Sequence, residues 1–301
     1  SQLPTIMNIR CNPHFAAIFR MLVLLLSGYM AVLLQSCQST ADEARPVLTV
    51  TIEPLRDVVE PLADGYFDVV TLMPRGASPE TYEPTPRQMV ELGESQALFC
   101  VGTLGFECTA VPKMLEASPG VQRIDLSQGI ETLPHADGCH DAAHGGDPHV
   151  WMSAQNLSRM TANACEALCQ IDTAHAAEYR ERAQKRQAYY SQTDSLLKQE
   201  AAQVRHRTFL IYHPALGYLA HQYGLVQLAV ERDGKEPSVA YLQQLEQRCK
   251  ADSVRVVFIS DEHSGRAAQR LAETVGARVV RIHPLQSQVD EQFFTILQAL
   301  K

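Results

Sequence analysis

The stretch "TAHAAEYRERAQKRQAYYSQTDSLLKQEAAQVR", residues 173–205, contains neither glycine nor proline. A run of this composition predicts one uninterrupted helix, which Asp172 can open. At 1.5 Å of rise per residue, about 30 residues would span roughly 45 Å. Because that length exceeds what one small lobe requires, we predict a rigid linking helix at 172–204 that joins two lobes.

The residues before this helix alternate between predicted strands and predicted helices. Segments rich in β-branched and apolar residues predict strands at 46–52, 67–73, 97–102 and 121–126. Helices are expected at 55–65 and from Pro86, with Thr85 as cap, to about Ser95. A further helix follows Trp151, with Ser153 as its cap.

The residues after the linking helix repeat the alternation. Strands are predicted at 207–212, 225–230, 254–260 and 277–282, and helices at 214–224, 238–250, 265–276 and 290–301. Strands that alternate with helices favour a parallel sheet wrapped by helices. The fold class is therefore α/β: two Rossmann-like lobes, 46–171 and 205–301, joined by the linking helix, with a ligand site in the cleft between them.

The N-terminal residues are typical of an export signal. Arg10 and Arg20 precede the apolar run "MLVLLLSGYMAVLLQSC" at 21–37, which is short for a membrane span of about 20 apolar residues. The run ends in a sequence that resembles a bacterial lipobox, so we expect 1–37 to be a lipoprotein signal peptide, Cys37 the lipidated residue and 38–45 a tether. An uncleaved anchor helix is the alternative, and both interpretations place the remaining chain outside the cytoplasm.

Composition and cysteine spacing exclude several classes of protein. A net charge of −8 argues against a nucleic-acid partner, because phosphate contacts need clustered Lys and Arg. Six cysteines follow Cys37 and form no CxxC pair, which disfavours a structural zinc finger and a disulfide-dense scaffold. Two of them share one helix face at a spacing of four, but their pairing does not follow from the sequence; the six are Cys100, Cys108, Cys139, Cys165, Cys169 and Cys249.

Histidines and carboxylates cluster in segments that flank predicted strands. His149 lies in "DPHVW", His213 ends a strand in "YHPALGY", Glu80 lies in "SPETYEP", and "SDEHSG" at 260–265 offers three further ligands. Side chains at the carboxyl ends of parallel strands line the ligand crevice. Two imidazoles with one or two carboxylates match a site for zinc or manganese. Taken singly, each of these residues could instead be an ordinary surface or strand-end residue.

Five stretches carry a family resemblance that extends from about Pro46 to the end of the chain. They are "MPRGASPETYEPTP", "VGTLGFE", "DPHVW", "YHPALGYLAHQYGL" and "ETVGARVVRIHPL", and they occur in the family's order. The chain resembles the ZnuA/TroA-like substrate-binding proteins of zinc and manganese ABC importers, cluster A-I. The resemblance implies two α/β lobes on a long helix, little hinge motion and a metal ion in the cleft.

The resemblance also implies a ligand set. His149 and His213 match family ligands, and Glu80, a harder ligand that favours zinc over manganese less strongly, stands where the family usually has His. The fourth family ligand is acidic; Glu262 is favoured here, Asp261 is next, and His263 is less like the family. His135, His140 and His144, in the glycine-rich loop 135–148, would be auxiliary metal sites; a polar insert with incidental histidines is the alternative.

The implied function is capture of a divalent metal, Zn²⁺ before Mn²⁺, and its delivery to an ABC permease and its ATPase. The protein would be an exported monomer held at a membrane by lipid on Cys37, and it would be no enzyme. A zinc-dependent hydrolase is disfavoured because HExxH, GxSxG and GxxxxGK[ST] motifs are absent from the sequence. A manganese receptor of the same family and a metal-dependent surface adhesin remain alternatives.

Overall fold

A computed structural model describes residues 44–134, 146–231, 237–262 and 265–301, and Arg45–Lys301 form one unit. The expected signal peptide, Cys37 and nearly all of the tether lie outside the described residues. Within those residues, no helix combines the length and the apolar character needed to cross a membrane.

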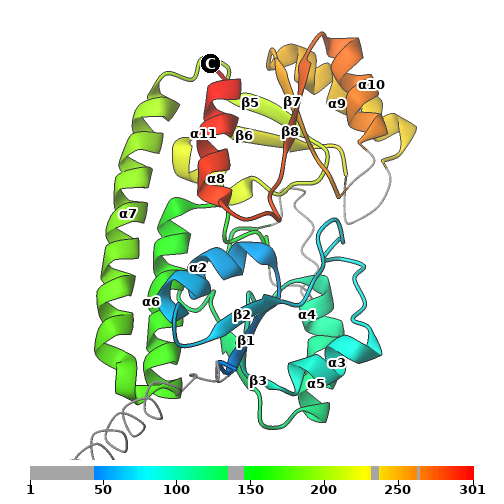
Figure 1. The fold of residues 1–301 in the computed structure, drawn as a ribbon. Coiled ribbons are helices and arrows are strands. Elements are labelled where there is room, and N and C mark those ends of the chain that lie inside the picture. Colours follow the sequence, from blue (N-terminus) through cyan, green and yellow to red (C-terminus); the bar gives the residue numbers. More distant parts are fainter. Residues whose placement is uncertain (1–43, 135–145, 232–236, 263–264) are drawn as a thin grey trace, which may run out of the picture. The chain divides into compact units, whose positions relative to one another are not determined.

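The N-terminal lobe contains a four-stranded parallel sheet of order β2-β1-β3-β4; β1, β2 and β3 are labelled in Figure 1. The four strands match the predicted ones: β1 (Val47–Val50), β2 (Asp68–Thr71), β3 (Ser95–Cys100) and β4 (Gln122–Asp125). Leu48 and Val50 on β1, and Leu98 and Phe99 on β3, are fully buried. Consecutive buried residues are expected where helices cover both faces of a parallel sheet.

Four helices accompany this sheet: α2 (Glu53–Ala63), α3 (Pro86–Leu92), α4 (Gly105–Thr109) and α5 (Val111–Ala117). Thr85 caps α3 as predicted, and its hydroxyl accepts a hydrogen bond from the backbone N–H of Gln88. The helix ends earlier than the predicted limit near Ser95, because Ser95 already begins β3. Helices α4 and α5 were not predicted: each has seven residues or fewer, as α3 has, but neither has a side-chain cap such as Thr85 to mark its start.

The C-terminal lobe repeats the topology with a parallel sheet of order β6-β5-β7-β8. Its strands are β5 (Thr208–Ile211), β6 (Val226–Ala229), β7 (Val256–Ser260) and β8 (Arg278–Ile282), and its helices are α8 (Gly217–Tyr223), α9 (Val239–Ala251), α10 (Arg266–Val275) and α11 (Val289–Ala299). Gly224 and Gly276 end α8 and α10 in the left-handed conformation, with φ of 66° and 71°. The two lobes confirm the predicted fold class.

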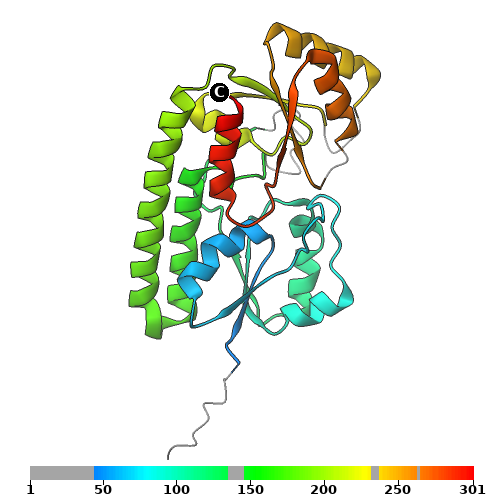
Figure 2. The same cartoon turned by 45° about the horizontal axis from the view of Figure 1, so that its top comes forward.

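The long helix α7 (Ala176–Ala202) lies beside α6 (Ala154–Ile171) in both views (Figures 1 and 2), and a 3-10 turn at Thr173–His175 connects them. Helix α7 also packs against α2 of the first lobe and α11 of the second. The Arg182 guanidinium donates to the Leu62 carbonyl oxygen at 2.7 Å, and the Tyr189 hydroxyl donates to Asp290 Oδ2 at 2.6 Å. The helix therefore touches both lobes, as the sequence predicts.

Polar contacts also join the lobes directly through the segment around Trp151. The Trp151 indole N–H donates to the Pro284 carbonyl oxygen at 2.8 Å, and the Ser153 hydroxyl lies 2.7 Å from Gln222 Oε1. Trp151 is fully buried. Such contacts hold the loop before α6 against the second lobe.

Candidate metal centre

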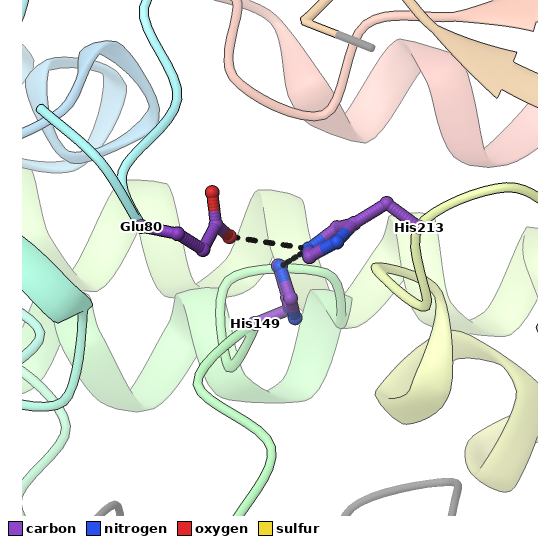
Figure 3. Close-up of side chains that lie close together, drawn as sticks. All are labelled: Glu80, His149 and His213. Carbon is purple, nitrogen blue, oxygen red and sulfur yellow. Dashed lines mark hydrogen bonds and ion pairs between the residues drawn. The ribbon is translucent and has the colours of Figure 1, made fainter. Parts of the chain in front are cut away.

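Glu80, His149 and His213 meet where three loops converge (Figure 3). Glu80 lies between β2 and α3, His149 between β4 and α6, and His213 follows β5. One potential ligand atom from each residue lies within 4.8 Å of the others. His213 Nε2 is 3.1 Å from His149 Nε2 and 3.3 Å from Glu80 Oε1. All three side chains follow parallel strands, which is where ligand crevices form in α/β folds.

The segment that carries Glu80 is held by its own loop and by the start of α4. The Ser78 hydroxyl donates to Glu80 Oε2. The Phe106 backbone N–H donates to the Pro79 carbonyl oxygen at 3.0 Å. A Cβ added to Gly105 would lie 3.1 Å from Glu80 Cα, so the absence of a side chain permits this close approach. The stretch "VGTLGFE" therefore supports the segment that carries Glu80.

The buried carboxylate of Asp147 orients the His149 imidazole. Asp147 Oδ1 lies 2.8 Å from His149 Nδ1 and also accepts the His149 backbone N–H at 2.9 Å. Both side chains are less than a tenth exposed. A carboxylate at Nδ1 fixes that nitrogen as the proton donor and leaves the Nε2 lone pair free to bind a metal.

The second lobe in turn restricts Asp147. The Tyr218 hydroxyl donates to the Asp147 backbone carbonyl oxygen at 2.9 Å. A Cβ added to Gly217 would overlap Asp147 Oδ2. Only glycine at position 217 leaves space for this carboxylate, so the orientation of His149 depends on close contact between the lobes.

Glu231, which follows β6, orients the His213 imidazole. Its Oε2 lies 3.2 Å from His213 Nδ1, and the two side chains are 9% and 12% exposed. Burial opposes the charged imidazolium, but the hydrogen bond to Glu231 and the nearby carboxylates outweigh it and raise the pKa of His213. A proton on His213 therefore competes with a metal ion for the same nitrogen.

The electrostatics favour a cation among the three side chains. With Nδ1–H directed at a carboxylate on each ring, both Nε2 lone pairs and a Glu80 oxygen converge on one space. Burial raises the pKa of Glu80, but His213, Ser78 and His149 outweigh this effect and hold that pKa below its ordinary value. Glu80 is the most exposed of the three, with 35% of its side chain accessible, so solvent reaches the centre from its side. Two imidazoles and an ionised carboxylate are ligands that zinc accepts.

The other predicted ligands are placed elsewhere or lie outside the described residues. Asp261 Oδ2 pairs with His283 Nδ1 at 2.6 Å, and its Oδ1 is 3.5 Å from the Arg281 guanidinium. In the part of the chain that the structure describes, neither Asp261 nor Glu262 joins the three clustered residues. His263 and the loop histidines His135, His140 and His144 lie outside the described residues.

Sequence reasoning missed Asp147, Glu231 and Gly217. A signal existed for Asp147, since an aspartate two residues before a candidate ligand can fold back on it, as "DPH" does here. Glu231 follows the strand next to β5, so strand order was needed to pair it with His213. The role of Gly217 depends on a contact between lobes and has no local signature.

Comparison with known proteins agrees with this geometry. A family model described as "Zinc-uptake complex component A periplasmic", ZnuA, matches residues 48–300. The chain belongs to the ZnuA family. Members of the ZnuA family are extracytoplasmic solute-binding proteins that work in transport with an ABC permease and its ATPase.

Individual members of the ZnuA family are similar along most of the chain. The chain is 27% identical to the high-affinity zinc uptake system protein ZnuA of Bacillus subtilis, over 85% of this chain and 84% of that protein. It is 26% identical to the zinc-binding lipoprotein AdcA of Streptococcus pneumoniae, over 89% of this chain but only 56% of AdcA. A crystal structure of ZnuA superimposes with a TM-score of 0.79 at 28% identity, over 84% of this chain and 97% of that one.

Proposed function

We propose that this protein captures Zn²⁺ outside the cytoplasm, at Glu80, His149 and His213, and delivers it to an ABC permease. The observation that carries the proposal is the convergence of the three potential ligand atoms within 4.8 Å. The metal is the cargo of the protein. A zinc-bound ZnuA deletion variant has the same fold, with a TM-score of 0.78 at 28% identity, which supports zinc as that cargo.

The ligand types favour zinc over manganese. Imidazole suits zinc, whereas manganese prefers sites made of carboxylate, carbonyl and water oxygens. Structural zinc sites are almost always four-coordinate, so the fourth position takes a water molecule or an acidic side chain. We propose Glu262 for that position and Asp261 as the alternative, since both follow β7 at the carboxyl edge of the second sheet.

The surrounding charges suit binding, and the placement of the ligands in two lobes suits release. Glu80, Asp147 and Glu231 together offer three negative charges, which exceed the charge of one divalent ion. His149 and His213 come from different lobes, so a movement of the lobes apart would separate these two ligands from each other. Binding and transfer require no covalent chemistry, and we propose no catalytic activity.

The export features complete the proposal. We propose that Cys37 carries the lipid, that 38–45 form the tether, and that His135, His140 and His144 bind additional metal ions transiently. The lipoprotein AdcA is a zinc-binding relative, which supports lipid anchoring. A receptor for manganese and a surface adhesin are the alternatives that the experiment below addresses.

Chelator-competition titration of the metal-stripped protein with Zn²⁺ and then Mn²⁺ tests the proposal. We expect one tight zinc site and much weaker manganese binding. His149→Ala and His213→Ala should each weaken zinc binding by at least about 100-fold. Each substitution removes one imidazole from the few protein ligands that hold the ion. His221→Ala is the matched control, since His221 is exposed on α8 and should have no effect. Unchanged zinc affinity in both site variants would refute the metal centre, and tighter manganese would identify a manganese receptor.

A further inference from the structure

Two cysteines line a cavity between α6 and α7, on elements that the zinc site does not use. Cys165 and Cys169 are one helical turn apart on α6, and neither is in a disulfide. The cavity has a volume of about 450 Å³. Its lining includes both thiols and four polar side chains from α6 and α7: Glu166, Gln170, Arg180 and Gln187.

The thiols lie close to each other and differ in their partners. Cys165 is 9% exposed, and Cys169 is partly exposed and donates to the Ala176 carbonyl oxygen at 3.5 Å. Burial, followed by the neighbouring Cys169 thiol, raises the pKa of Cys165 to about 11. The Arg180 charge acts in the opposite direction and favours a thiolate at Cys165.

Helix geometry disfavours a disulfide between these residues. Side chains four residues apart on a helix have Cβ atoms about 5–6 Å apart, whereas a disulfide requires a separation of about 3.5–4.5 Å. Closing the bond would distort α6, which packs along α7 and contributes Leu157, Met160, Ala164 and Leu168 to the core. The pair therefore stays reduced more readily than a flexible pair would, even where disulfides usually form.

A metal ion can bridge two thiolates across a longer distance than a sulfur–sulfur bond. Soft thiolate ligands select Cu⁺, zinc and iron–sulfur clusters, and an iron–sulfur cluster takes four thiolates. Zinc would need further ligands to complete a tetrahedral shell, and Glu166 is the one other carboxylate, imidazole or thiol among the lining residues. We propose that Cys165 and Cys169 form a second metal site, which binds one Cu⁺ ion between two thiolates.

The binding step balances in charge and protons. One Cu⁺ and two thiols give a bis-thiolate complex of charge −1 and release two protons, with no change in oxidation state. The Arg180 guanidinium, at the same cavity, compensates the negative charge. The site is independent of Glu80, His149 and His213, so the protein can hold a soft monovalent ion and its divalent cargo together.

Anaerobic competition of the full chain with a chromophoric Cu⁺ chelator tests the site. We expect Cys165→Ala and Cys169→Ala each to weaken Cu⁺ binding by more than about tenfold, since two-coordinate binding needs both sulfurs. Cys108→Ala removes an exposed thiol and should leave the affinity unchanged. His213→Ala should also leave Cu⁺ binding unchanged, which separates this site from the imidazole centre.

Thiol counting after exposure to air provides a second readout that does not depend on the affinity of the variants. The folded protein is exposed to air and is then unfolded for the reaction with a thiol reagent. We expect Cys165 and Cys169 still to react as free thiols. Equal Cu⁺ affinity in the two alanine variants and the wild type, or quantitative conversion of the pair to a disulfide in air, would overturn the proposal. Far-UV circular dichroism of each variant establishes that α6 is retained.

Discussion

The Nε2 atoms of His149 and His213 face each other at 3.1 Å, while a buried carboxylate lies beside the Nδ1 atom of each ring. The two rings come from different lobes and meet at 72° between their planes. Neutral imidazoles with Nδ1 protonated present two lone pairs to each other, which is unfavourable without a cation between them. The carboxylates beside the Nδ1 atoms therefore determine what the Nε2 atoms can bind.

Loss of either orienting carboxylate should weaken zinc binding without removing a ligand. We expect Asp147→Asn and Glu231→Gln to lower zinc affinity about 10- to 100-fold, the usual effect of losing a partner of a metal-binding histidine. Glu246→Gln on α9 is a control for Glu231→Gln, because Glu246 pairs with Lys250 on the surface. Affinities equal to wild type in both site variants would show that the carboxylates do not orient the rings.

The Glu231 variant should also change the pH dependence. The folded-state pKa of His213 is raised, so His213 takes up a proton at a higher pH than a free histidine, and zinc affinity should fall as pH decreases through that range. Removing the Glu231 charge lowers this pKa and moves the loss of affinity to lower pH. Zinc titrations from pH 5.5 to 8, values chosen around the ordinary histidine pKa of about 6.5, measure the shift; parallel curves for variant and wild type would contradict it.

Gly217 permits the contact between Asp147 and the second lobe. Gly217→Ala should displace the Asp147 carboxylate, because the new Cβ would overlap its Oδ2, and zinc affinity should fall about tenfold or more as His149 loses its orientation. Gly120→Ala is the control, since an added Cβ there meets no atom within 4 Å. A Gly217 variant with wild-type zinc affinity would mean that Asp147 has another position from which to hold His149.

The sequence predicted the fold well, because local patterns determine it. All eight strands of the described residues follow from runs of β-branched and apolar residues, and α7 follows from a run without Gly or Pro. Glu80, His149 and His213 could be named as candidates because each lies in a stretch that carries the family resemblance, and the structure brings them together. Two supporting residues could not be predicted. Pairing Glu231 with His213 requires the strand order, and the contact between Gly217 and Asp147 joins two different lobes. Helices α4 and α5 were also missed, because neither has a side-chain cap that marks its start.

The glycine-rich loop provides a test of auxiliary sites. Deleting residues 136–146 should remove weak zinc binding and leave the tight site, because Glu80, His149 and His213 all lie outside the deleted segment. Zinc titration of the deletion variant against wild type measures the number of sites of each class. Loss of the tight site would mean that the loop supplies a ligand to the centre.

Asp57 connects the lobes and should make stability depend on pH. Its carboxylate accepts the backbone N–H of Gln288, at the start of α11, although Asp57 belongs to α2 of the other lobe. Burial, with a further contribution from Asp290, raises the pKa of Asp57 to about 6, although the Gln288 N–H and Arg186 oppose this. The folded protein therefore holds a proton more tightly than the unfolded chain, so this residue's contribution to stability is complete below about pH 4, the unfolded pKa, and is lost as pH rises through about 6.

Asp57→Asn should remove that dependence, because the amide carries no charge and its oxygen can still accept the Gln288 N–H. We expect a Tm a few degrees above wild type at pH 7.5, where wild-type Asp57 is ionised, and a much smaller gain near pH 4.5, where the folded protein still holds the proton. Glu116→Gln on α5, an exposed carboxylate, should leave the wild-type profile unchanged. Thermal unfolding of metal-free protein between these pH values measures the difference, and an Asp57→Asn profile parallel to wild type would show that this carboxylate is not the group that titrates.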